Sequence, residues 1–196
     1  MKAYVATKNA DKMRELRALF AGSLLELETY PDYEEVDETA DDYAGNARLK
    51  ARGLHAQLVA AGTHAAVLAD DSGIEVEALG GRPGVYSARY GGKVSWPQRL
   101  AMLLAELNGM PDEQRGARFV CAMAFITADA CLYESQGEVR GVVAHDQFGP
   151  NGFGYDPIFY YPPLKKTFGE IAEEEKNRLS HRYNAAQALL TALHAR

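Results

Sequence analysis

The sequence contains little cysteine, no long apolar run and no surplus of basic residues. Only two cysteines, Cys121 and Cys131, occur among its 196 residues, which excludes a small scaffold held together by disulfides. The two thiols could face each other across a hairpin, but the apolar stretch around them favours two buried free thiols. No cysteine and histidine spacing typical of a metal site is present.

Membrane and export signals are also missing. No segment approaches the roughly 18 continuous apolar residues that a membrane-spanning helix needs. The apolar run at the N-terminus, within residues 1–7, is too short for a signal peptide. We therefore expect a cytoplasmic protein that does not associate with a membrane.

The charge balance argues against one class of partner. The formal net charge is −6, from 21 basic and 27 acidic residues, whereas a protein that grips a nucleic-acid polymer usually carries a basic surplus. A small polyanion needs only a local cluster of cations and stays possible. Apolar residues make up 47% of the chain and charged residues 24%, as in ordinary globular proteins. The length suits one domain, 1–196, which could be divided into two lobes.

Strand and helix patterns alternate along the chain, which predicts an α/β protein with a mixed sheet. We expect helices near 10–21, 43–61, 96–108 and 181–195, the first of them capped by Asn9. Strands are expected at 3–6, 65–71, 74–76 and 158–161, with a hairpin formed by 119–127 and 132–143. The acidic segment 31–42 and the glycine-rich segments 80–92 and 149–157 are expected to be loops.

The start of the first helix is a candidate anion site. Free N–H groups and a partial positive charge at a helix N-terminus attract anions. Lys12 falls in the first turn, where a cation is mildly unfavourable unless an anion lies nearby. An ordinary capped helix with Lys12 in solvent explains the same residues.

Paired carboxylates close the apolar run at 65–71. Asp70 and Asp71 are expected to end this strand at a sheet edge, where α/β proteins bind ligands. Since neighbouring strand residues face opposite sides, one carboxylate could bind a metal or activate water while the other holds the turn. With Glu38, Asp71 could hold Mg²⁺, which favours one or two carboxylates and substrate phosphate oxygens. The alternatives are a solvated Asx turn and a solvated acidic loop.

Two later segments also carry functional side chains. In the loop 149–157, glycines flank Phe153, so the backbone can approach a ligand closely and the ring could stack on a base. Alternatively, Phe153 packs inward in a tight turn. Ser180 is expected to cap the last helix, which puts His181 and Arg182 in its first turn. Two potential cations at the positive end of the helix dipole are unfavourable unless a phosphate lies near them. A surface helix start with solvated charges is the alternative.

Six segments, in order, resemble the inosine triphosphate pyrophosphatase family along essentially the whole chain. They are Ala6-Thr7-Lys8-Asn9-Ala10-Asp11-Lys12, Asn46-Ala47-Arg48-Leu49-Lys50-Ala51, Asp70-Asp71-Ser72-Gly73-Ile74-Glu75-Val76, Gly81-Arg82-Pro83-Gly84-Val85-Tyr86-Ser87-Ala88-Arg89-Tyr90, Gly152-Phe153-Gly154-Tyr155-Asp156-Pro157-Ile158-Phe159 and Glu175-Lys176-Asn177-Arg178-Leu179-Ser180-His181-Arg182. The resemblance implies an elongated mixed β-sheet with flanking helices, two lobes around a deep active-site cleft, and a homodimer.

The resemblance also implies an activity and a set of site residues. Members of this family hydrolyse non-canonical purine nucleoside triphosphates (ITP, dITP and XTP) to the monophosphate and pyrophosphate with Mg²⁺. Carried over by position, Glu38 and Asp71 resemble the metal ligands, and Asp71 resembles the proton acceptor for the attacking water. Lys50 is a further phosphate partner. The substrate contacts implied are Thr7, Asn9, Lys12, Ser72, Phe153, Gly154, Tyr155, Asp156, Lys176, His181 and Arg182.

Two positions depart from the family pattern. Gly45 stands where the family usually has a glutamate, and the segment 167–171 has Gly-Glu-Ile in place of Ala-Glu-Met. Neither removes a residue assigned to chemistry. Asp156, His181 and nearby backbone are expected to select the base, since buried hydrogen-bond mismatches discriminate strongly.

Two other functions are compatible with this sequence. A pyrophosphatase could act on modified pyrimidine or ordinary nucleotides instead, and a nucleotide sensor could bind without hydrolysis. The intact carboxylates count against the sensor, because a binder needs no carboxylate to activate water.

Overall fold

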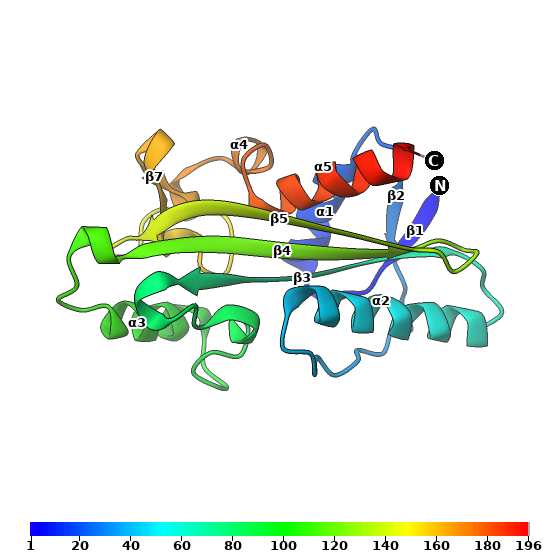
Figure 1. The fold of residues 1–196 in the computed structure, drawn as a ribbon, viewed down its shortest axis with the longest axis horizontal. Helices are drawn as coiled ribbons and strands as arrows, with labels where there is room; N and C mark the ends of the chain where they lie inside the picture. Colours follow the sequence, from blue (N-terminus) through cyan, green and yellow to red (C-terminus); the bar gives the residue numbers. More distant parts are fainter. Residues whose placement is uncertain (196) are drawn as a thin grey trace. The chain divides into compact units, whose positions relative to one another are not determined.

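The chain forms two compact units in a computed structural model that describes residues 1–195 (Figure 1). Unit 1 comprises Met1–Asp71, Cys121–Gly137 and the chain from His181 onward. Unit 2 comprises Ser72–Val120 and Glu138–Ser180. The expectation of a single domain with two lobes stays a prediction.

Seven strands form one mixed sheet, in the order β2-β1-β3-β4-β5-β6-β7. β1 pairs in parallel with β2 and with β3, whereas β6 pairs antiparallel with β5 and with β7. The α/β class with a mixed sheet is thereby confirmed, although β2 and β7 were not predicted. The strands are β1 (Lys2–Val5), β2 (Glu26–Thr29), β3 (Ala66–Val76), β4 (Gly116–Ile126), β5 (Leu132–Val143), β6 (Phe159–Tyr161) and β7 (Lys166–Thr167).

The four predicted helices are present in residues 1–195. A fifth, single-turn α-helix, α4, was not predicted. The helices are α1 (Ala10–Phe20), α2 (Tyr43–Ala60), α3 (Trp96–Glu106), α4 (Glu173–Lys176) and α5 (His181–His194). Asn9 is the N-cap of α1 as expected, because its side-chain oxygen accepts hydrogen bonds from the backbone N–H groups of Asp11 and Lys12. Within residues 1–195, no helix combines the length and the apolar character needed to cross a membrane.

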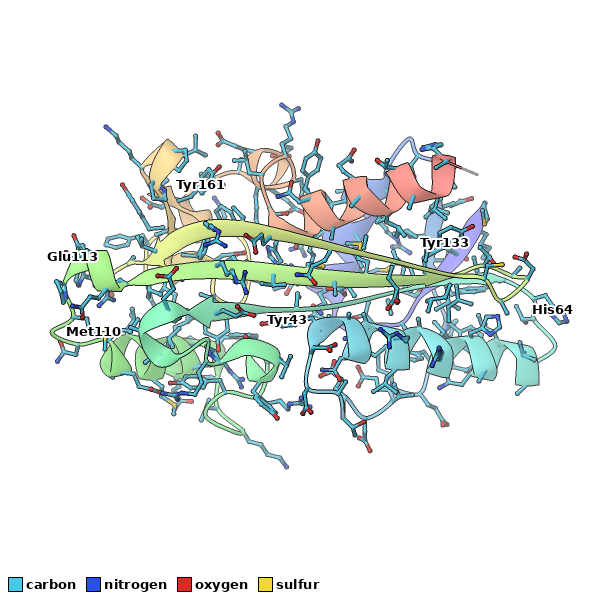
Figure 2. The ribbon with its side chains drawn as sticks, viewed as in Figure 1. Tyr43, His64, Met110, Glu113, Tyr133 and Tyr161 are labelled. Atoms are coloured by element: carbon cyan, nitrogen blue, oxygen red, sulfur yellow. The ribbon has the colours of Figure 1, made fainter. Side chains whose placement is uncertain are left out.

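In unit 1, α1 and α5 cover one face of the sheet and α2 the other (Figure 1). Because strand side chains alternate between faces, Cys121, Met123 and Phe125 of β4 share one side. They pack against apolar residues of α1 and α5, and Tyr133 of β5 packs at the margin of this core (Figure 2). The α1 and α5 residues of this core include Met13, Leu16, Leu19, Phe20, Ala185, Ala186 and Leu189.

In unit 2, an aromatic core fixes the segments that follow β5. The rings of Phe119 and Phe159 have centroids 4.4 Å apart, and those of Phe159 and Phe168 lie 4.9 Å apart. Leu100 and Leu103 of α3 belong to the same core. This packing sets the position of the loop 149–157, which ends where the core residue Ile158 begins.

β3 corrects one sequence prediction. The strand does not end at the two aspartates but continues through them to Val76. Its partner β1 ends at Val5, opposite Leu68, so Asp70 and Asp71 still lie just past the carboxyl end of a parallel strand. β3 can continue through two buried carboxylates because charged side chains from the helices pair with them.

The cysteine prediction is confirmed in part. Both thiols are free. Cys121 is buried in β4, but Cys131 is only half-buried, which contradicts the expected burial. Cys131 lies at the hairpin turn, where its backbone N–H donates to the Thr127 hydroxyl and its carbonyl accepts from the Thr127 N–H.

Candidate functional site

Asp70 forms ion pairs with basic side chains at the start of two helices of unit 1. Its Oδ2 lies 3.1 Å from Lys12 Nζ and 3.3 Å from Arg182 Nε. Lys12 is in the first turn of α1 and Arg182 in the first turn of α5. Each cation was expected to need an anion near a positive helix end, and this carboxylate supplies one for both.

Arg182 is also bound to Glu15 of α1. Its Nη1 lies 3.0 Å from Glu15 Oε2, and both side chains are buried. The alternative of a solvated start to the last helix is therefore wrong at Arg182. A phosphate is not required to explain this cation, because two carboxylates of the same unit already neutralise it. His181, the first residue of α5, is buried beside it.

Asp71 faces the opposite side of the sheet, toward α2. Its Oδ1 lies 3.2 Å from Lys50 Nζ, and its Oδ2 accepts a hydrogen bond of 3.2 Å from Asn46 Nδ2. Lys50 Nζ also lies 2.8 Å from Glu38 Oε1. The opposite orientation of the two aspartates follows from strand alternation, as predicted. One ammonium therefore joins the two carboxylates expected to hold a metal.

The pKa values of these neighbouring carboxyls shift in opposite directions. Burial alone would raise the pKa of Asp70, but Lys12, Arg182 and Lys50 outweigh it and hold that pKa well below its ordinary value. Burial raises the pKa of Asp71, and Lys50 and Lys12 offset only part of this effect. Environments that separate the pKa values of two adjacent acids mark candidates for different chemical roles. Asp70 is held as an anion, while Asp71 gains basicity.

The donor set on the α2 side fits a hard divalent cation. Glu38 and Asp71 are both carboxylates, and their spacing lets them bind one cation, the Lys50 ammonium. Mg²⁺ is usually held by one or two carboxylates together with substrate oxygens and water. Within residues 1–195 no group of three or more His, Cys, Asp or Glu side chains forms a complete protein cage, so the remaining ligands would have to come from outside the chain.

Thr7 and Asn9 line a pocket at the start of α1. The pocket has a volume of about 560 Å³ and is lined by Thr7, Lys8, Asn9, Ala10, Met13, Arg14, Arg17, Thr29, Tyr30 and Pro31. The Thr7 hydroxyl accepts a hydrogen bond from the Asn9 N–H and so fixes the turn before the helix. Lys8 precedes α1, and Arg14 and Arg17 lie along the helix, so the pocket has basic side chains that suit an anionic ligand.

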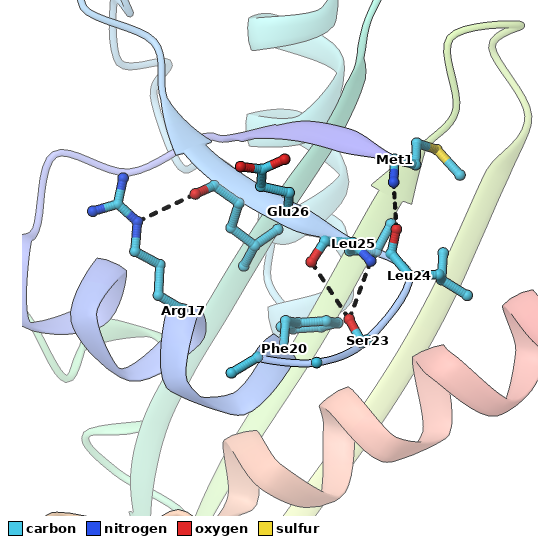
Figure 3. A pocket seen from close by; sticks show the side chains of 10 residues that line it. Met1, Arg17, Phe20, Ser23, Leu24, Leu25 and Glu26 are labelled. Atoms are coloured by element: carbon cyan, nitrogen blue, oxygen red, sulfur yellow. Dashed lines mark hydrogen bonds between the residues drawn. The ribbon is translucent and has the colours of Figure 1, made fainter.

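Another pocket of unit 1 contains none of the predicted site residues. It has a volume of about 480 Å³ and lies between the end of α1 and β2 (Figure 3). Arg17 Nε donates to the Leu27 carbonyl, and Ser23 Oγ accepts from the Leu25 N–H. These hydrogen bonds pair polar groups within the segment that joins α1 to β2. They point to no ligand, so we assign the pocket no role.

In unit 2, a buried ion pair holds the glycine-rich loop. Lys176 Nζ lies 2.6 Å from Asp156 Oδ2, and the same oxygen accepts from the Phe153 N–H at 2.8 Å. The ammonium also lies 4.8 Å from the centroid of the Phe153 ring. Phe153 is half-buried and its ring is in contact with the Lys176 ammonium, so stacking on a base and packing inward in the turn both stay open as predictions.

Tyr155 of this loop contacts α3 and the loop that precedes α3. Tyr155 is buried, and its hydroxyl donates to the Ser87 carbonyl at 2.9 Å. Its ring meets Trp96 edge-on with centroids 5.5 Å apart. Gly154 has a positive φ of 62°, a conformation that favours glycine. Ser72, also in unit 2, is half-buried in β3.

Sequence reasoning gave no chemical role to two residues of the unit 1 cluster. They are Glu15 and Asn46, of which only Asn46 lay in a quoted motif. Glu15 had one available signal: it follows Lys12 by three positions and so shares its helix face. A carboxylate beside the apolar stripe of α1 indicates a buried partner.

Comparisons with known proteins identify the family of the chain. Residues 3–192 match the Ham1 family. The dITP/XTP pyrophosphatase of Geobacillus kaustophilus is 46% identical over 189 residues, covering 94% of this chain and 90% of that protein. A HAM1 protein from Coxiella burnetii has a TM-score of 0.87 at 33% identity and covers 100% of both chains.

A second solved structure is the nucleoside-triphosphatase and dITP/XTP pyrophosphatase from Mycobacterium abscessus. It has a TM-score of 0.72 at 42% identity, covering 97% of this chain and 99% of that one. The similarity in sequence and fold thus extends over nearly the whole length of the chain. This chain belongs to the Ham1 family.

Proposed function

We propose that this protein hydrolyses dITP, XTP and related non-canonical purine nucleoside triphosphates to the monophosphate and pyrophosphate. The observation that carries the proposal is the full-length similarity to curated dITP/XTP pyrophosphatases, such as the one that is 46% identical. The unit 1 cluster supports it, because it contains carboxylates for water activation and cations for phosphates.

Asp71 is the proton acceptor in this proposal. Burial raises its pKa, so the carboxylate takes a proton more readily than one in water. Lys50 and Asn46 each hold one of its oxygens, which fixes the carboxylate plane. Asp71 orients a water and deprotonates it for attack at the α-phosphorus, and pyrophosphate leaves. Asp70, kept anionic by two cations, does not compete for the proton.

Glu38 and Asp71 would hold Mg²⁺. When bound, the ion would neutralise phosphate charge, which carries much of the catalysis in phosphoryl transfer. Lys50, which now pairs with both carboxylates, would then be available to a phosphate oxygen.

Lys12, Thr7 and Asn9 would contact the triphosphate. Lys12 keeps 17% of its side chain exposed and can turn from Asp70 to a phosphate without leaving Asp70 bare, because Arg182 stays in place. Arg182 is nearly fully buried and therefore acts on phosphate through this network. Phe153 offers its ring to the base, while Asp156 and Lys176 hold the ring in position. Base selection by Asp156 and His181 stays a prediction, as do the homodimer and the cytoplasmic location.

Rates on a nucleotide panel test the proposal. We expect dITP, ITP and XTP to be cleaved at least about 10²-fold faster than ATP and GTP, because unmatched polar groups on the base are rejected strongly. Phosphorus NMR should identify pyrophosphate as the product, and a chelator should abolish turnover. Equal rates on ATP and GTP, or fastest cleavage of pyrimidine nucleotides, would overturn the specificity. Binding without any product would favour a sensor.

A further inference from the structure

Asn46 lies between the proposed proton acceptor and the loop that supplies the other proposed metal ligand. We infer that Asn46 is a positioning residue that holds Asp71 and the Glu38 loop in a fixed relation. The inference rests on the proposed function, and it concerns side chains of unit 1 alone.

Both ends of the Asn46 amide are used. Nδ2 donates to Asp71 Oδ2 at 3.2 Å, while Oδ1 accepts from the Ala40 N–H at 3.0 Å. Asn46 is fully buried, with 0% of its surface exposed. Because an amide carries a donor and an acceptor in one rigid plane, it can bind a carboxylate and a backbone N–H at once. A carboxylate at this position would repel Asp71, and a hydroxyl would be too short to span both groups.

The two bonds constrain the two proposed metal ligands together. Lys50 holds Asp71 Oδ1 and Asn46 holds Oδ2, so the carboxylate cannot rotate freely. Ala40 is two residues after Glu38, so its anchored N–H restrains the loop that carries the Glu38 side chain. Outer partners of this kind orient the groups that contact a metal or substrate.

Gly45 allows the loop that carries Glu38 and Ala40 to approach the first turn of α2. A Cβ at position 45 would lie 2.5 Å from the Ala40 Cβ, well inside the closest contact that two carbons tolerate. The absence of a side chain therefore lets the loop lie against the first turn of α2, where Asn46 Oδ1 reaches the Ala40 N–H. The glycine that departs from the family pattern thus has a local role in this chain.

Gln57 provides a matched control on the same helix. Its Oε1 accepts from the Glu34 N–H at 2.9 Å, and its Nε2 donates to the Glu34 carbonyl at 2.7 Å. Like Asn46, Gln57 is an amide of α2 that anchors the loop 31–42 by a donor and an acceptor. Unlike Asn46, which donates to Asp71, Gln57 has both of its bonds to the Glu34 backbone. Any effect of simply loosening the loop should appear in both variants.

The experiment compares Asn46→Ala with Gln57→Ala in the full chain. We expect Asn46→Ala to lower kcat on dITP by about 10- to 100-fold and KM to change by less than about threefold. Mn²⁺ binding, measured by electron paramagnetic resonance without nucleotide, should weaken by about tenfold. Gln57→Ala should leave kcat and Mn²⁺ binding within about threefold of the parent. The inference fails if the two variants lose kcat or Mn²⁺ affinity equally, or if the loss lies in KM.

Gly45→Ala keeps the test decisive if Asn46→Ala does not fold. The added methyl should push Ala40 away and break one bond, while the bond from Asn46 to Asp71 stays. We expect weaker Mn²⁺ binding in Gly45→Ala than in the parent and in Gln57→Ala. Unchanged Mn²⁺ binding in Gly45→Ala would overturn the coupling of the loop to Asn46. If the parent cleaves no dITP or XTP, the proposed function fails, and the Mn²⁺ titrations alone decide the role of Asn46.

Discussion

The two units carry their buried charges in different ways. In unit 1, Arg182 joins Asp70 to Glu15 and Lys50 joins Asp71 to Glu38. Asp70 also contacts Lys12, so Asp70, Lys50 and Arg182 each have two partners of opposite sign. In unit 2, Lys176 and Asp156 form one close pair, with 4% and 3% of their side chains exposed.

A carboxylate with two cations, such as Asp70, can release one to a ligand and keep the other. In a close buried pair, removal of one member takes away a counter-charge in direct contact with the other, which is strongly unfavourable. We therefore expect unit 1 substitutions to affect activity more than stability, and the Lys176 pair to show the reverse.

Asp71→Asn should have the largest effect on activity. Removing a general base typically costs about 10²- to 10⁴-fold, so kcat on dITP should fall by that amount while the circular dichroism spectrum is retained. Glu75→Gln on the same strand is the control, because Glu75 pairs with Arg118 away from the cluster. Near-parental kcat in Asp71→Asn would remove Asp71 from its proposed role.

Lys176→Met should have the largest effect on stability. It leaves the Asp156 carboxylate buried without its cation, which should lower the free energy of unfolding by about 3–5 kcal/mol in urea titrations. Adding Asp156→Asn should restore part of the loss, since the uncompensated charge is then gone. A loss below about 1 kcal/mol would show that removing one partner of this pair costs no more stability than removing one cation from the unit 1 cluster.

Lys12→Met should destabilise the protein less. Asp70 keeps Arg182, and Lys12 is partly exposed, so we expect a loss of about 1 kcal/mol in the same titrations. KM for dITP should rise more than kcat falls if Lys12 binds the triphosphate in ground and transition states alike. A stability loss as large as that of Lys176→Met would erase the proposed contrast.

The smallest effects concern the pH dependence of stability. The pKa of Asp70 is lowered on folding, so its contribution is present above its ordinary pKa of 3.8 and is lost as pH falls through the folded value. The pKa of Asp71 is raised, so its contribution is present below 3.8 and is lost as pH rises through the folded value.

Two amide variants separate these contributions. Measured with chelator, Asp70→Asn should lose less stability than the parent on acidification below about pH 4. Asp71→Asn should gain stability relative to the parent as pH rises above about 4, because the parent alone loses the contribution of the protonated Asp71 carboxyl. The same slope in both variants would contradict the opposite pKa shifts.

Local sequence signals predicted most of the fold. Asn9 capped the expected helix, because a cap depends on neighbours only a few residues away. β2 and the two-residue β7 were missed, since such short strands are defined by their partners across the sheet. The expected end of β3 at Asp71 was wrong for a similar reason: the neutralising cations come from distant helices, which local polarity does not reveal.

The sequence singled out several residues of the unit 1 cluster but not their connections. For Lys12 the dipole argument asked for an anion and for Arg182 it asked for a phosphate, and in the structure Asp70 lies beside both. Asn46 was visible only as part of a motif, because its role depends on Ala40 and Asp71, which reach it through tertiary packing.

The bond between Arg182 and Glu15 joins residues 167 positions apart, and the bond to Asp70 spans 112. A growing chain on the ribosome can therefore place Lys12 beside Asp70 long before Arg182 has been synthesised. Until then Glu15 lacks the arginine that neutralises it in the folded protein. The charge network can therefore be completed only after α5, which begins at His181, has been synthesised and packs against α1.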